Sequence, residues 1–253
     1  MPMFLNRMIQ MIGACAAGFL GVVFGIGGGI ILVPVLLYTG VKAKETIATS
    51  LSIITVIALS GTLHHIKMET LVINNTNALL VFSAIAGGII GSLMLKAINN
   101  RFLTYLLTTY FYIMGIILIF VPHFIGIESK YTFDYSLSWI AGLPAATISS
   151  MLGIGGGTIL TPILLYLFKT NIKETIGVVM PFIFFLSLTA SLVNIKNKFI
   201  NVTSFVLMLP SALLGTFIAY NYFNRIDDLH IQIGLGIILV INALVMTRLY
   251  IFR

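Results

Sequence analysis

The sequence predicts an all-helical, polytopic integral membrane protein built from two similar halves. Of its 253 residues, 59% are hydrophobic and only 8% are charged, and the mean hydropathy is +1.09. A soluble domain of this length carries about a quarter charged residues. At roughly 20 apolar residues per crossing, the chain has room for about eight to ten crossings and little else. The remaining observation is a short glycine-rich stretch that occurs twice.

The glycine-rich stretch opens each half of the chain. The first copy, residues 25–34, reads GIGGGIILVP, and the second, residues 153–162, reads GIGGGTILTP. Four glycines in five residues do not hold a stable helix, because each costs about 1 kcal/mol relative to alanine. Two such breaks at matching places in an apolar chain are typical of paired discontinuous membrane helices around a central site.

The other hydrophobic segments follow in the same order in both halves. In the first half we expect segments at residues 8–24, 30–38, 47–66, 72–95 and 103–120, and in the second at 136–152, 159–168, 175–195, 199–222 and 229–252. The most polar connection, residues 122–135, is interpreted as a linker between a first repeat, 1–121, and a second, 136–253. Shared pairs outside the glycines, such as KETI at 44–47 and 173–176, support one duplicated unit.

The sequence leaves open how each glycine-broken segment crosses the membrane. If it crosses once, each half has four crossings, the repeats are parallel, and Lys and Arg divide 7 to 7 between the two sides. If it re-enters and leaves on the same side, each half has three full crossings, the repeats are inverted, and the division becomes 9 to 5. A full span followed by a returning half-helix would also produce an inverted pair. The positive-inside rule and the architecture of known transporters mildly favour inversion.

The charged residues exclude some classes of protein. The net charge of +7 is interpreted as interfacial anchoring rather than nucleic-acid binding, because nearly all charges lie in short connections. Cys15 is the only cysteine, so no intrachain disulfide forms. The apolar run after Arg7 resembles a signal peptide, but the same run recurs at residues 134–152, so we interpret it as a crossing.

Each glycine break is followed by a short helix that could bind an anion. Pro34 and Pro162 fall in its early turns, where a missing amide costs little. The free amides and the positive end of the helix dipole form an anion site where they face a cavity. Thr158 and Thr161 add hydroxyl donors to the second copy. Small residues also let membrane helices pack closely, but packing does not explain four glycines in five with a following proline, so we favour the site.

Small polar residues line the crossing that follows each break. Thr49, Ser52 and Thr55 are spaced i, i+3, and in the second half Ser187, Ser191 and Asn194 fall at i, i+4, i+7. These side chains either line a polar path or bond back to their own helix, and both interpretations stay open. The candidate solute-binding residues are Gly25, Gly27, Gly28, Gly29, Pro34, Gly153, Gly155, Gly156, Gly157, Thr158, Thr161, Pro162, Ser52, Thr55, Ser187, Ser191 and Asn194.

Several kinds of chemistry have no candidate residues. All seven acids lie in or at connections, so the expected crossings hold no carboxylate for ion coupling. There is no aspartyl dyad or nucleophile–base pair for an enzyme, and no phosphate-binding loop for a pump. The pair His64-His65 lacks a carboxylate or cysteine at metal-ligand spacing. We therefore expect neither enzymatic activity nor a cofactor or metal.

The paired glycine stretches, each followed by proline, resemble those of the sulfite exporter TauE/SafE family of two-repeat bacterial permeases. The length and the eight hydrophobic segments, counting each broken segment once, fit over essentially the whole chain. The resemblance implies a secondary transporter in the bacterial cytoplasmic (inner) membrane. Its implied solutes are small sulfur-containing anions such as sulfite, sulfoacetate or sulfonates. The alternative class is a structural or assembly membrane protein without transport; solute, direction and oligomeric state stay open.

The missing carboxylates also bear on the driving force. Moving one charge through the membrane field is worth about 2.3 kcal/mol per 100 mV. An anion leaving a cell that is negative inside therefore already moves downhill. Import would need a compensating cation, and the only titratable candidates near a crossing are His64 and His65. We expect electrogenic, largely passive anion movement in which both histidines are dispensable.

Overall fold

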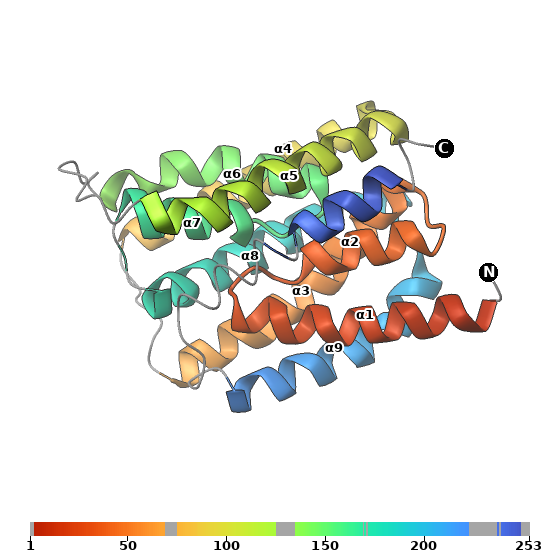
Figure 1. Cartoon of the computed structure of the whole chain (residues 1–253). Coiled ribbons are helices and arrows are strands. Elements are labelled where there is room, and N and C mark those ends of the chain that lie inside the picture. The colour runs from red at the N-terminus through yellow and green to blue at the C-terminus, as the bar shows by residue number, and fades with distance from the viewer. Residues whose placement is uncertain are drawn as a thin grey trace.

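The computed structural model describes residues 3–68, 75–124, 135–168, 170, 172–222, 237 and 239–248, and every element among them is a helix (Figure 1). The elements are α1 (Met3–Val23), α2 (Gly29–Tyr38), α3 (Ala43–Lys67), α4 (Asn75–Ala97), α5 (Asn100–Phe124), the 3-10 helix η1 (Tyr135–Leu137), α6 (Ser138–Leu152), α7 (Gly157–Leu167), α8 (Ile172–Lys196) and α9 (Val202–Tyr222). Residues 239–246 are also helical. Most of the expected linker 122–135 and of the crossing 229–252 lies outside the described residues; α5 continues to Phe124.

Five of the described helices are long and apolar enough to cross a membrane. They are α1, α3, α4, α8 and α9, each with a strongly hydrophobic window of 18 residues. Large apolar side chains on their outer faces, such as Phe82 and Phe217, each 68% exposed, suit contact with acyl chains. Helices are the natural solution here, because a helix satisfies its own backbone hydrogen bonds where the bilayer offers none. The expectation of an all-helical polytopic protein is confirmed.

Helix α2 runs back along α1 as the second arm of a hairpin. Gln10 Nε2 donates to Thr39 Oγ1 at 2.8 Å, so α1, two turns after its start, lies beside the end of α2. At the other end, the backbone of Gly21 lies against that of Gly28. The 10 residues of α2 span about 15 Å, half of a bilayer core. The pair therefore enters and leaves at one end of the molecule.

Helices α6 and α7 form a second hairpin with the same plan. The ring of Tyr135, just before α6, lies 6.1 Å from the ring of Phe168, just after α7. Helix α7 has 11 residues and is again about half a bilayer core in length. In Figure 1 the first hairpin has its open end at the right, beside the N-terminus, and the chain enters the second hairpin from the left.

Each hairpin packs against helices from the other half of the chain. Helix α1 lies along α9, and α6 lies along α4. Glycines allow both approaches: a Cβ on Gly18 would lie 2.0 Å from the carbonyl oxygen of Ala212, and one on Gly91 2.2 Å from that of Thr147. Between the hairpins, α3 and α8 pack side by side and antiparallel and form the centre of the molecule.

Three of the connections lie together at one end of the molecule. Lys44 at the start of α3 donates from Nζ to the carbonyl oxygen of Lys96 (2.7 Å) and from its amide to Asn100 Oδ1 (3.1 Å). Asn201, which caps α9 by accepting from the amide of Ser204, donates from Nδ2 to Glu45 Oε2 at 3.4 Å. We call this the basic end, because it carries Arg7, Lys42, Lys44, Lys96, Arg101, Lys196 and Lys198.

Candidate functional site

The two glycine turns, residues 24–28 and 152–156, join the arms of the hairpins. Three glycines in each turn have positive φ: Gly25, Gly27 and Gly28 at 64°, 76° and 82°, and Gly153, Gly155 and Gly156 at 76°, 87° and 88°. Any residue with a Cβ loses about 1–2 kcal/mol in this left-handed region. The glycines therefore stop one helix and restart another within five residues, which neither alanine nor serine would do.

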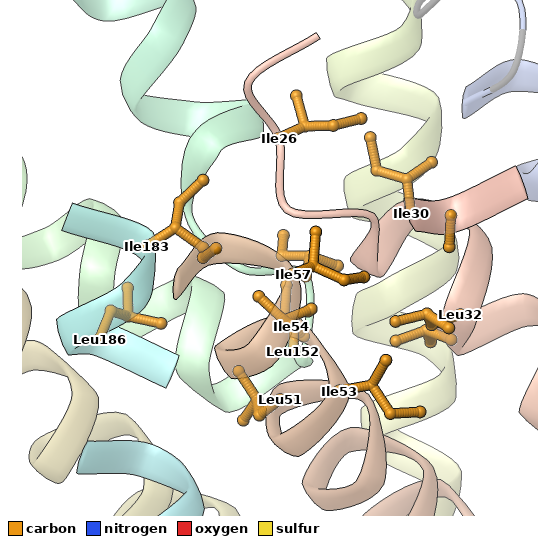
Figure 2. Packing of buried hydrophobic residues seen from close by; sticks show 14 of the residues in the cluster. Ile26, Ile30, Leu32, Leu51, Ile53, Ile54, Ile57, Leu152, Ile183 and Leu186 are labelled. Atoms are coloured by element: carbon orange, nitrogen blue, oxygen red, sulfur yellow. The ribbon is translucent and has the colours of Figure 1, made fainter. Parts of the chain in front are cut away.

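The two glycine turns meet in the interior of the protein. A Cβ on Gly29 would lie 2.6 Å from Ile154 Cα, and one on Gly157 would lie 2.2 Å from the carbonyl oxygen of Gly25. Every residue from 24 to 30 and from 152 to 158 is buried. Figure 2 shows the apolar side chains packed around this contact, among them Ile26, Ile54 and Ile183. The two stretches, for which the sequence predicts a place around a central site, thus lie against each other.

The amides at the start of α2 face this contact. Ile26 and Gly27 both donate to the carbonyl oxygen of Gly21, at 3.0 and 3.1 Å, and Ile31 and Leu32 donate to that of Gly28. Among the described residues, the amides of 28, 29 and 30 have no backbone acceptor. Gly28 packs on Ala17 and Gly21 of α1, and the opposite glycine turn lies against Gly29. An anion would reach these amides only if the two turns separated, so their role as an anion site stays a prediction.

The prolines after the turns free a backbone carbonyl in the first turn of each short helix. Pro34 has no amide to donate to Ile30 four residues earlier, and Asn242 Nδ2 donates to the Ile30 carbonyl oxygen instead, at 2.9 Å. In the second hairpin, the hydroxyl of Tyr110 on α5 is hydrogen-bonded to Thr158 Oγ1. Asn242 and Tyr110 were not among the sequence candidates. Asn242 could have been found as a polar amide side chain within an apolar run.

The remaining candidates of the second half, on α7 and α8, differ in whether they have a hydrogen-bond partner. Thr161 Oγ1 is buried and has no hydrogen-bond partner, and Pro162 beside it is buried as well. On α8, Ser187 Oγ donates to the carbonyl oxygen of Phe184 at 3.2 Å. Asn194 is fully buried, and both its amide oxygen and its amide nitrogen lack a partner. Such buried unpaired groups are costly, which makes Thr161 and Asn194 candidates for contact with a solute or water.

A cleft of about 620 Å³ lies between α3, α8 and the start of α9, and we call it the α3/α8 cleft. It is lined by Ser52, Thr55, Leu188, Ser191, Leu192, Ile195, Lys198, Ile200, Val202 and Phe205. Ser52 Oγ lies 3.3 Å and Thr55 Oγ1 3.4 Å from Ser191 Oγ, so three predicted residues from two helices form one hydroxyl cluster. Thr49 is separate, because its hydroxyl accepts from the amide of Asn201.

A second cavity of about 320 Å³ lies at the opposite end of α8. It is lined by Asn77, Tyr135, Leu164, Thr170, Glu174, Thr175 and Val178. The Tyr135 hydroxyl donates to Asn77 Oδ1 at 2.8 Å. Burial, with the Glu174 carboxylate nearby, raises the pKa of Tyr135 to about 12, so this hydroxyl stays a donor at neutral pH. The glycine turns line neither cavity, and the described residues hold no cluster of three or more metal-ligating side chains.

Alanine substitutions can test separately the two reasons for glycine, which are close packing and a positive φ. Gly29 and Gly157 have no left-handed φ, so alanine there tests packing alone. Gly40 has φ of 90° with nothing within 4 Å, so alanine there tests backbone strain alone. We expect Gly29→Ala and Gly157→Ala to lower the free energy of unfolding by about 3 kcal/mol or more, and Gly40→Ala by about 1 kcal/mol. Unfolding of the purified variants in detergent measures this; equal losses at all three positions would contradict the contact.

Cysteine cross-linking tests whether the turns meet in the membrane. Ile26→Cys and Ile154→Cys, combined in a Cys15→Ser background with a protease site inserted within residues 122–135, should cross-link with a short bifunctional reagent. The two fragments then stay together on a denaturing gel after proteolysis. The pair Ile26→Cys and Phe217→Cys, the latter on the outer face of α9 and beyond the cut, is the control and should separate. Separation of both pairs would refute the central contact.

Sequence comparison with known proteins identifies a family. The family model described as Sulfite exporter TauE/SafE matches residues 10–246. The chain is 26% identical over 247 residues to the probable membrane transporter protein YunE of Bacillus subtilis, covering 83% of this chain and 86% of that protein. It is 26% identical over 171 residues to a probable membrane transporter protein of Methanocaldococcus jannaschii, covering 64% of each.

A shorter match is to the Sulfite exporter TauE/SafE family protein 6 of Arabidopsis thaliana, 36% identical over 80 residues, which cover 32% of this chain and 18% of that protein. No solved structure matches the chain. The family match extends over nearly the whole chain and agrees with the apolar helices described above. The chain therefore belongs to the sulfite exporter TauE/SafE family and is a multi-pass integral membrane protein of the transporter type.

Proposed function

We propose that this protein is a secondary transporter that carries small anions across the bacterial inner membrane, with its two halves acting as inverted repeats. The observation that carries the proposal is the pair of half-length returning helices whose glycine turns meet in the interior. In known transporters, discontinuous helices of this kind surround a solute site near the middle of the bilayer. The family name, Sulfite exporter TauE/SafE, supports sulfite and related sulfur-containing anions as solutes.

The proposed inversion is supported by the opposite directions of the hairpins. The first hairpin opens where Gln10 meets Thr39, at the basic end, because α3 begins there. The second opens near Tyr135 and Phe168, beside the start of α8, while α8 ends at the basic end. In this proposal α1, although long enough to cross a membrane, turns back with α2, so that neither hairpin contributes a full crossing and the repeats are related by an axis in the membrane plane. Parallel repeats would need both hairpins to open on the same side.

The transport path is proposed to run past the glycine contact. The two cavities lie near opposite ends of α8, and the glycine turns separate them. When the turns move apart, the unbonded amides at the starts of α2 and α7 become available to an anion. Inverted repeats allow such a site to open alternately to the two sides. Thr158 and Thr161 would then add hydroxyl donors from one half only.

The charge distribution supports a direction. Of the ten described cations, the basic end carries the seven named above, Lys67 and Lys173 lie at the other ends of α3 and α8, and Arg248 ends the last described helical segment. The positive-inside rule assigns the basic end to the cytoplasm. The α3/α8 cleft, which has Lys198 in its lining, would then accept anions from the cytoplasm. This arrangement fits export, which is electrically downhill for an anion in a cell that is negative inside.

The competing proposal is a structural membrane protein, and the tight packing of the glycine turns favours it. Proteoliposomes with radiolabelled sulfite or a sulfonate decide between the two. We expect protein-dependent flux that stops when Ile26→Cys and Ile154→Cys are joined by a disulfide and resumes on reduction, because the locked turns cannot separate. Liposomes containing the Cys15→Ser protein serve as the control. No flux from folded protein over a broad panel of anions would support the structural role.

Electrogenic transport without histidine coupling is a second expectation. The His64 ring stacks on Tyr220 at 4.1 Å, and Tyr220 is hydrogen-bonded to Ser60 at 2.7 Å, so the ring already has a packing role. His65 is 2% exposed, and Asn194 occupies the matching position of the second half. We expect His64→Ala and His65→Asn, separately and together, to retain an anion current in voltage-clamped bilayers. Electroneutral transport that needs a pH gradient and is lost in the double variant would favour import instead.

A further inference from the structure

We propose that the α3/α8 cleft is a binding site for a small organic anion with an apolar body, and that Lys198 recognises its charge. This inference rests on the proposed function and goes further, because it names a site, a cation and a preference over compact inorganic anions. Lys198 was absent from the candidates chosen by sequence, since it looks like an ordinary lysine in a connection.

The cleft has the size and lining of a small-molecule site. Its volume of about 620 Å³ lies within the range of about 300–1,000 Å³ that ligand pockets occupy. Leu188, Ile200 and Phe205 belong to its apolar wall, and the polar lining is confined to the three hydroxyls and Lys198. A compact anion such as sulfite would leave these apolar walls in contact with water. An anion with a hydrocarbon body would cover them, which favours binding.

In the hydroxyl cluster, one of the three hydroxyl protons is not donated to a backbone carbonyl. Ser52 Oγ donates to the carbonyl oxygen of Ala48 at 3.0 Å, and Thr55 Oγ1 donates to that of Leu51 at 2.8 Å. Ser191 Oγ has no backbone acceptor and contacts only the other two hydroxyl oxygens. A hydroxyl carries a single proton. Because two of the protons are held by carbonyls, Ser191 is the member able to donate to a polar group of the solute.

Lys198 holds a backbone position that glycine would fill at less cost. Its amide donates to the carbonyl oxygen of Ile195 at 3.0 Å, and the amide of Phe199 donates to that of Asn194 at 3.1 Å. These two bonds form the Schellman motif that ends α8, in which glycine usually occupies the left-handed position. Lys198 has φ of 56° and is the only non-glycine residue with positive φ among the described residues. Such local strain is typical of functional sites.

No carboxylate competes for Lys198 within the cleft. The described lining contains three hydroxyl residues, six apolar residues and this lysine. Glu45, in the first turn of α3 at the same end of the molecule, accepts from Asn201 instead. The lysine therefore brings an uncompensated positive charge to an otherwise apolar site. A solute anion is the complement that the cleft itself lacks.

A lipid is the competing occupant, because part of the lining faces outward. Leu192 is 53% exposed, Ile195 57% and Val202 66%, so the cleft borders the bilayer. An acyl chain would fit the apolar wall and its phosphate would suit Lys198. The hydroxyl cluster favours a solute, since an acyl chain has no polar group to offer Ser191. The test below separates the two.

Calorimetric titration of the purified full chain in nanodiscs tests the site. The probes are sulfite and the straight-chain ethane-, butane- and hexanesulfonates, all at the same ionic strength. We expect affinity to rise about threefold to fourfold for each added methylene group, with sulfite the weakest. Equal affinities along the series would overturn the proposal. So would hexanesulfonate that binds only after tightly bound phospholipid has been extracted.

Variants of Lys198 distinguish recognition from structure. We expect Lys198→Gln and Lys198→Gly to weaken butanesulfonate binding at least about tenfold, as for loss of a charged hydrogen bond. Lys198→Gly should nevertheless unfold at an equal or higher temperature, because glycine suits the left-handed position. Lys198→Arg should restore most of the affinity. Lys196→Gln, which removes an exposed charge from the same end without touching the cleft, is the matched control and should bind normally.

The results also separate this inference from the proposed function. Sulfite flux that is unchanged in Lys198→Gly, together with unchanged butanesulfonate affinity, refutes the site and leaves the transporter intact. If binding depends on chain length and on Lys198 as expected but no anion is transported, the site is supported and transport is refuted. Lys198→Gly that binds as tightly as the original chain assigns the lysine a purely incidental position.

Discussion

The contact between the two glycine turns is the interaction on which the rest of the structure depends. Each turn leaves helix ends, and hence unpaired backbone groups, in a region where the bilayer offers no water. The other turn, together with α1, α3 and α8, buries them, and glycine allows the approach of the two turns, since Cβ atoms on Gly29 or Gly157 would overlap the opposite backbone. The half-length helices α2 and α7 can therefore end inside the membrane protein without facing lipid.

The sequence predicted the class, the breaks and their meeting, because those follow from composition and from the stereochemistry of glycine. It could not decide between crossing and re-entry, since a 10-residue helix has the same length in both; the contact of Gln10 with Thr39 supports the proposed re-entry. The i, i+3 spacing placed Ser52 and Thr55 on one face of a helix. Their contact with Ser191 could not be predicted, because it depends on how α3 and α8 pack. Lys198 was not predicted as a binding residue, because nothing in the sequence distinguishes it from other lysines in connections; its positive φ is visible only in the structure.

The two halves share a backbone plan but differ in polar groups, and this difference supports a directional function. At the start of α2 stands Ile30, whose carbonyl is held by Asn242, whereas at the start of α7 stands Thr158, whose hydroxyl meets Tyr110. The hydroxyl cluster also has no matching partner, because Pro181 and Phe184 stand where the first half has Ser52 and Thr55. With the proposed inverted repeats, these unequal linings would present different chemistry to the two sides of a membrane.

The exchange of packing partners between the halves has a consequence for biogenesis. During synthesis α1 is released from the ribosome long before α9, yet the backbone groove at Gly18 is filled by Ala212. Until then the first hairpin lacks the partner that buries it, and its short arm must wait in the membrane or beside the insertion machinery. The same crossover means that neither half contains a complete interior. Two separately synthesised halves would therefore have to find each other in the bilayer, as the subunits of an antiparallel dimer do.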